Sequence, residues 1–114
     1  MKVQVLVAAM NQYNHNLLDK MNIDSDVIVG NQCEMNSVEQ FQYKNHQAVY
    51  LNFNEVGVGL NRNNALMRAT GDICLFADDD MVYVPNYNEI ILSAFEMNPK
   101  ADVIIFNLYE EHPS

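Results

Sequence analysis

The sequence predicts an α/β fold in which a mostly parallel sheet is flanked by helices. Short, apolar, β-branched segments alternate along the chain with segments whose apolar residues recur at helical spacing. Glycine or proline stands at several of the boundaries between them. Such alternation is typical of βαβ units, whose strands run parallel. A chain of 114 residues with 49% hydrophobic residues predicts one domain over residues 1–114.

The predicted strands are short runs such as VQVLVAA, which are too apolar to face water on both sides. Parallel strands covered on both faces have this composition. Five segments fit this description: residues 3–9, 25–30, 48–53, 72–77 and 101–109.

Four further segments connect the predicted strands. Residues 16–21 carry apolar side chains at helical spacing and predict a short helix. We expect residues 35–42 to form a short helix or an irregular crossing. Residues 59–70 again have helical spacing and stop at a glycine, so we expect a helix there. Residues 86–98 predict an amphipathic helix, with one proline just before it and one just after it.

The charge distribution excludes some partners. The net charge is −9, and the half after Gly57 holds nine acidic residues against three basic ones. A nucleic-acid backbone requires a basic surface, so we expect no nucleic acid as the main partner.

The sequence has no apolar run of about 18 residues that could cross a bilayer. We therefore expect a cytoplasmic protein, or one at the inner face of the membrane. Cys33 and Cys74 have no metal-site or redox spacing.

Three consecutive aspartates, Asp78, Asp79 and Asp80, follow the predicted strand at 72–77. Aspartate is common in turns, so these residues could simply begin the next helix. Three adjacent like charges nevertheless cost more than a single cap requires, and the strand before them is fully apolar. Hard carboxylate oxygens suit Mg²⁺ or Mn²⁺, which usually bind one or two carboxylates together with substrate phosphates. The position after a strand therefore favours a divalent cation at this triplet of aspartates.

Other polar groups follow the remaining predicted strands. Asn11 follows the first strand, Asn31 the second, and a segment with two glycines and Arg62 the third. In an open parallel sheet, ligands bind beyond the carboxyl ends of the strands. We therefore expect these groups to share one edge with the aspartates. Arg62 can bind a phosphate through its guanidinium group, or can pair with a surface carboxylate.

Four segments form a recognisable series along the chain: VQVLVAAMN (3–11), DVIVGNQC (26–33), NEVGVGLNRNNALMRATGD (54–72) and ICLFADDDMVYVPNY (73–87). Taken together, they resemble the N-terminal half of a family 2 glycosyltransferase of the GT-A type. The last two carry the Gly and Arg-Asn motif, the Asp-x-Asp motif and the following proline. The resemblance covers nearly the whole chain and implies a Rossmann-like GT-A fold that binds a nucleotide diphosphate sugar through Mn²⁺ or Mg²⁺.

The resemblance also implies roles for the residues around the metal. Asp80 is similar to the family's metal ligand, and Asp78 is the other aspartate of the Asp-x-Asp. Asp79 lies between them, where it could reach the ribose or the metal. Arg62 matches the arginine of the Arg-Asn pair.

The base side of the nucleotide site is implied in the same way. Ala8 stands where the family has a Thr or Pro beside the base, and Asn11 follows it in the first loop. Asn31 stands where the family often has an aspartate that bonds the nucleobase. An amide can donate as well as accept, so this departure could change the base that is bound.

The family's acceptor site and general base lie in a second half, which this sequence does not contain. The resemblance therefore implies a truncated GT-A fold, with its catalytic residues unknown and its acceptor hydroxyl unidentified. Exposed apolar surface on such a fragment would favour a homo-oligomer. Two alternatives stay open: a nucleotidyltransferase-like enzyme, and a non-catalytic module that binds nucleotide sugars.

Overall fold

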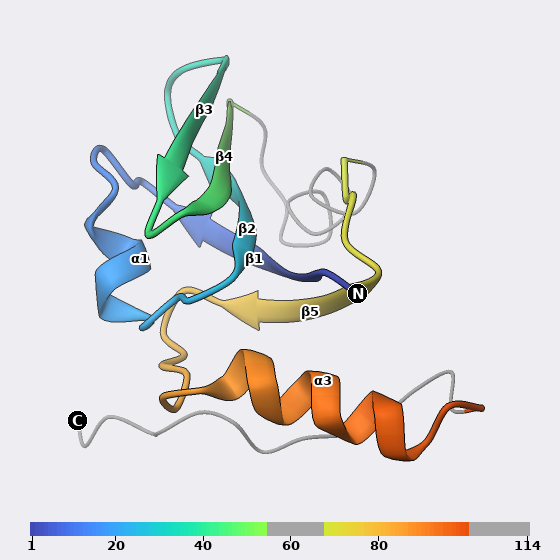
Figure 1. Ribbon diagram of the computed structural model, residues 1–114. Coiled ribbons are helices and arrows are strands. Elements are labelled where there is room, and N and C mark those ends of the chain that lie inside the picture. The colour runs from blue at the N-terminus through green and yellow to red at the C-terminus, as the bar shows by residue number, and fades with distance from the viewer. Residues whose placement is uncertain (55–67, 101–114) are drawn as a thin grey trace.

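The computed structural model describes residues 1–54 and 68–100, and within them the strands form a single sheet (Figure 1). The elements are β1 (Val3–Met10), α1 (Asn16–Lys20), β2 (Asp26–Gln32), β3 (Ser37–Tyr43), β4 (His46–Phe53), β5 (Ile73–Asp78) and α3 (Tyr87–Met97). The strand order is β3-β4-β2-β1-β5. β1, β2, β4 and β5 are parallel, and β3 is antiparallel to β4. The predicted α/β fold with a mostly parallel sheet is confirmed.

The larger part of the core lies between the sheet and the two helices. Leu17 and Leu18 of α1, together with Tyr87 and Ile91 of α3, pack against alternate residues of the strands. A smaller cluster lies on the opposite face of the sheet and contains Leu6, Ile28 and Leu51. The strands are thus apolar on both faces, as their composition predicts.

The strand order reverses at β1. The chain moves outward from β1 to β2 and then β4, and it returns to β5 on the other side of β1. In open α/β sheets, such a reversal leaves a crevice at the carboxyl ends of the two strands that flank it. The crevice expected here lies where β1 and β5 end.

The prediction of a helix or an irregular crossing at residues 35–42 is wrong. This segment forms β3, an edge strand that pairs with β4 through a hairpin. Lys44 and Asn45 link the strands with φ angles of 47° and 64°, the two positive values that a type I′ turn requires. Phe41 and Tyr43 are two residues apart and both pack against the core, whereas their neighbours are exposed. This period of two is typical of a strand with one solvated face.

The other predicted elements in the described residues are confirmed, with ends that differ by one or two positions. The predicted helix at 59–70 falls largely outside the described residues. The predicted strand at 101–109 and Arg62 fall wholly outside them.

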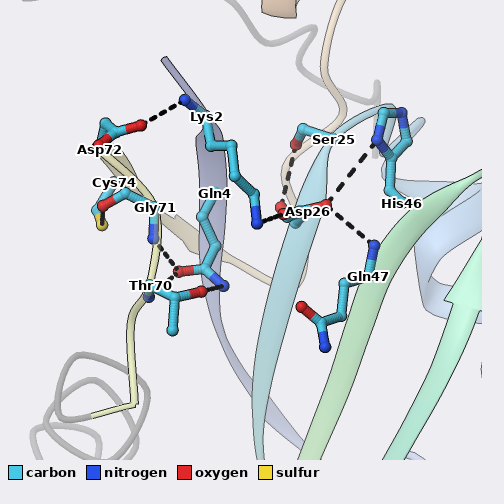
Figure 2. A network of polar contacts seen from close by, with 10 residues as sticks. All are labelled: Lys2, Gln4, Ser25, Asp26, His46, Gln47, Thr70, Gly71, Asp72 and Cys74. Carbon is cyan, nitrogen blue, oxygen red and sulfur yellow. Dashed lines mark hydrogen bonds and ion pairs between the residues drawn. The ribbon is translucent and has the colours of Figure 1, made fainter.

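The amino-terminal edge of the sheet is held by side chains that bridge separate strands (Figure 2). Asp26 accepts a hydrogen bond from the Gln47 amide at 2.9 Å and pairs with Lys2 Nζ at 2.9 Å. Gln4 Oε1 accepts a hydrogen bond from the Gly71 amide at 3.1 Å. A Cβ atom at Gly71 would lie 2.6 Å from Gln4 Cβ, so only glycine allows this close approach.

Candidate functional site

The three aspartates lie at the carboxyl end of β5, at the reversal of strand order. Asp78 is the last residue of β5 and is paired with Ala8 of β1. Asp79 and Asp80 form a turn, which the Met81 amide closes by donating to the Asp78 carbonyl at 3.2 Å. Asp80 is exposed, and the other two aspartates are partly exposed. The three carboxylates therefore lie at the end of β5, where the crevice between β1 and β5 is expected.

The electrostatics at Asp79 reflect this crowding. Burial raises the pKa of Asp79, and the neighbouring charges of Asp80 and Asp78 raise it further. A hydrogen bond from the Met10 backbone acts in the opposite direction and lowers the pKa. The negative charges thus disfavour one another, and Asp79 contacts the end of β1.

The segment that follows the aspartates is fixed against the end of α1. The Tyr83 amide donates to the Met21 carbonyl at 2.8 Å, and Asn22 Nδ2 donates to the Tyr83 carbonyl at 2.9 Å. The Tyr83 ring also packs against Tyr87 at the start of α3, with the ring centroids 4.6 Å apart. The turn of aspartates is therefore held on both sides by ordered structure.

The loop after β1 borders the same crevice. Asn11 is exposed, has a φ angle of 53°, and donates its amide to the Gln32 carbonyl at 2.8 Å. Asparagine adopts this left-handed conformation more readily than most residues do. Together with the contact between Met10 and Asp79, this bond fixes the loop between β2 and the aspartates.

Asn31 lies inside β2, whereas the sequence placed it in the loop that follows. It is fully buried, and its side chain binds both backbone groups of Gln12: Oδ1 accepts from the amide at 3.0 Å, and Nδ2 donates to the carbonyl at 2.8 Å. Asn31 Nδ2 also donates to Asn52 Oδ1 at 2.8 Å. Asn31 thus connects the loop after β1 to the neighbouring strand β4.

The network continues to the edge strand. Asn52 Nδ2 donates to Glu39 Oε2 at 2.9 Å and to Ser37 Oγ at 3.1 Å, both on β3. Glu39 Oε1 lies 3.2 Å from His15 Nε2, and the His15 ring stacks on Phe41.

The sequence did not single out Asn52, Glu39 or His15. Asn52 stands opposite Asn31 in the register of β2 and β4, and that register depends on a pairing that the sequence alone does not give. Glu39 and His15 come together only because residues 37–43 form a strand.

The remaining predicted site residues fall in different places. Ala8 is buried in β1 between Gly30 and Asp78. Arg62 lies outside the described residues, so its position relative to the aspartates stays a prediction.

The donor set at the crevice suits a hard divalent cation. Carboxylate oxygens are the ligands that Mg²⁺ and Mn²⁺ prefer, and a cation would offset the mutual repulsion at Asp78, Asp79 and Asp80. In residues 1–54 and 68–100, no group of three or more His, Cys, Asp or Glu side chains is arranged to hold a metal ion. A cation at this position would therefore draw further oxygen ligands from water or from a bound molecule.

Two further features bear on the sequence predictions. No helix in the described part of the chain is long and apolar enough to cross a membrane. Cys33 and Cys74 are both free thiols, the first buried and the second partly exposed.

The comparisons with known proteins give one match. The sequence model of glycosyl transferase family 2 matches residues 15–112, which is most of the chain. No curated protein and no solved structure shows a significant similarity. The matched range includes β2, β4, β5 and the three aspartates.

Proposed function

Because this chain belongs to glycosyl transferase family 2, we propose that it binds a nucleotide diphosphate sugar for transfer of the sugar to an acceptor hydroxyl. The observation that carries this proposal is the placement of Asp78, Asp79 and Asp80 at the reversal of strand order, beside the end of β1. In open α/β sheets, the crevice at such a reversal is the usual ligand site.

In this proposal, Asp78 and Asp80 hold Mg²⁺ or Mn²⁺, and the cation binds the diphosphate. Its chemical contribution is to offset the negative charge that develops on the diphosphate as the sugar leaves. Asp79 lies between the two proposed ligands in sequence and is proposed to reach the ribose or the metal. Arg62 is proposed to add positive charge near the phosphates.

The base is proposed to lie against the loop after β1 and the end of β2. Ala8 offers a small side chain at this position, and Asn11 is exposed in the loop. Asn31 is proposed to support this site from within β2, where it is fully buried and bound to the backbone of Gln12. The identities of the base, the sugar and the acceptor do not follow from these contacts.

Calorimetric titration with UDP and with GDP tests this proposal. We expect wild-type protein to bind at least one of them more tightly with Mn²⁺ than without it, because the diphosphate supplies oxygens that the aspartates alone cannot. By linkage, the nucleotide must strengthen Mn²⁺ binding by the same factor.

Asp80→Asn is the informative variant, and Glu89→Gln on the exposed first turn of α3 is its control. Asp80→Asn should weaken nucleotide binding about tenfold or more with Mn²⁺, because it removes one of the two proposed carboxylate ligands of the metal. Without Mn²⁺ it should change binding little or improve it, because Asp80 then only repels phosphate. Equal, metal-independent binding by wild type and Asp80→Asn would remove the aspartates from the site.

A further inference from the structure

The side-chain amide of Asn31 is fixed in one orientation by the backbone of Gln12. A backbone N–H can only donate, and a backbone carbonyl can only accept. Asn31 Oδ1 must therefore accept from the Gln12 amide, and Asn31 Nδ2 must donate to the Gln12 carbonyl. The other Nδ2 hydrogen goes to Asn52 Oδ1. Both N–H groups of the Asn31 amide are therefore used within the protein, and the residue is fully buried.

The orientation of Asn52 is fixed from the opposite end. Its Nδ2 group donates to Glu39 Oε2, and an ionised carboxylate can only accept. Its Oδ1 atom is thereby left to accept from Asn31. The carboxylate of Glu39 and the backbone of Gln12 thus require the same orientation of the two amides between them.

We propose that Glu39, Asn52 and Asn31 are positioning residues of the nucleotide site, which together hold the loop after β1 in the shape that receives the ligand. Asn31 acts through the Gln12 backbone and does not read the base by direct contact. The proposal rests on the function proposed above, because it assigns these residues to that same site.

The loop after β1 is short, so a change in the position of Gln12 would also affect the residues beside the aspartates. Gln12 is bound to Asn31, and Ala8, four residues earlier on β1, is paired with Asp78 of β5. Between them, the Asn11 amide is bonded to β2. A displacement of Gln12 would therefore move the segment that lies against the proposed metal site.

Asn31→Asp breaks the network with almost no change of shape. A carboxylate at position 31 can still accept from the Gln12 amide. Its second oxygen, however, would replace Asn31 Nδ2, which lies 2.8 Å from both the Gln12 carbonyl oxygen and Asn52 Oδ1, and two oxygens without a hydrogen between them repel each other. Asn52 could turn to donate to the new carboxylate, but its own oxygen would then face Glu39 at about the present 2.9 Å.

Glu39→Gln supplies an N–H group that can donate to Asn52 Oδ1 once the Asn52 amide has turned. It should therefore partly restore nucleotide binding to the Asn31→Asp protein. In the Glu39→Gln single variant, the glutamine oxygen can still accept from Asn52 as the carboxylate does. Glu34→Gln is the matched control, since it also removes one negative charge close in sequence but lies outside the network and is exposed.

Titration with UDP and GDP in the presence of Mn²⁺ compares these proteins. Asn31→Asp should weaken binding about tenfold or more, as opposed buried acceptors require. Adding Glu39→Gln should recover at least about threefold of this loss, and adding Glu34→Gln should recover none. Unchanged binding in Asn31→Asp, or equal recovery by Glu34→Gln, would overturn the proposal.

A milder pair of variants covers the case in which Asn31→Asp does not fold. Glu39 is exposed, and Glu39→Ala removes the carboxylate that accepts a hydrogen bond from Asn52. This variant should shift the Gln12 amide resonance in a ¹H–¹⁵N spectrum, whereas Glu39→Gln should not. Equal spectra at Gln12 for both variants would overturn the proposal. This readout needs no ligand, so it still decides the matter if wild-type protein binds neither nucleotide, a result that would count only against the proposed function.

Discussion

At the scale of single residues, the two edges of the sheet use polar side chains differently. At the amino-terminal edge, Asp26 faces a cation and a backbone donor, Lys2 and the Gln47 amide. At the carboxyl edge, three aspartates are adjacent, and the charges of Asp80 and Asp78 help to raise the pKa of Asp79. A carboxylate beside a cation stabilises the fold, whereas like charges held close together are retained at a cost and indicate a candidate binding site.

Asp26 provides a test of the first case. Burial alone would raise its pKa, but the hydrogen bonds from Lys2 and Gln47 and the charge of Lys2 outweigh it and hold the pKa below its usual value. A carboxyl whose pKa is lowered on folding stabilises the protein above its unfolded pKa, and this stabilisation is lost as the pH falls through the folded value.

Asp26→Asn should therefore lower the free energy of unfolding by about 1 kcal/mol at pH 7, a modest figure because Lys2 is exposed. The difference from wild type should shrink as the pH falls below about 4. Urea unfolding at several pH values measures both effects, with the exposed Glu96→Gln as control. A difference that stays constant with pH would mean that the charge of Asp26 does not stabilise the fold.

At the scale of elements, the sequence predicted those strands and helices whose pattern is local. β1 and α3 follow from an apolar run and from helical spacing between prolines. β3 could not be predicted in this way, because it is an edge strand whose mostly polar residues alternate only weakly. The strand is stabilised by pairing with β4 and by the turn at Lys44 and Asn45, and these two residue types do not by themselves predict the backbone geometry of that turn.

The hairpin turn can be tested at Asn45, whose φ angle is 64°. Asn45→Gly should raise the free energy of unfolding by about 0.5–1 kcal/mol, because glycine favours this position of a type I′ turn. Asn45→Val should lower it by about 1–2 kcal/mol, because a β-branched residue adopts positive φ poorly. Thermal unfolding of both variants measures the difference, and opposite signs would show that the turn differs from type I′.

At the scale of the whole molecule, the strand order decides which residues meet. The sequence predicted that the strand ends share an edge, and the parallel pairing of β1, β2, β4 and β5 agrees with this. It did not predict the order of the strands, so it could not identify the crevice between β1 and β5 as the reversal point. It also did not predict that Asn31 would be enclosed by Gln12 and Asn52, because that depends on long-range pairing.

Several whole-molecule expectations stay predictions. Among them are self-association, a location in the cytoplasm and the role of Arg62. Phe76 of β5 is 50% exposed on the face of the sheet that carries Leu6, which is the kind of surface that self-association would cover.

Paramagnetic broadening by Mn²⁺ tests the central claim most directly. With UDP or GDP present, Mn²⁺ should broaden the amide resonances of Met10, Asn11, Asp79 and Asp80 first, because these residues surround the proposed metal. The Gln47 amide, at the opposite edge of the same sheet, should stay sharp under the same conditions. Broadening that begins at Gln47, or that spares Asp79 and Asp80 while nucleotide is bound, would contradict a metal-bound nucleotide at the end of β5.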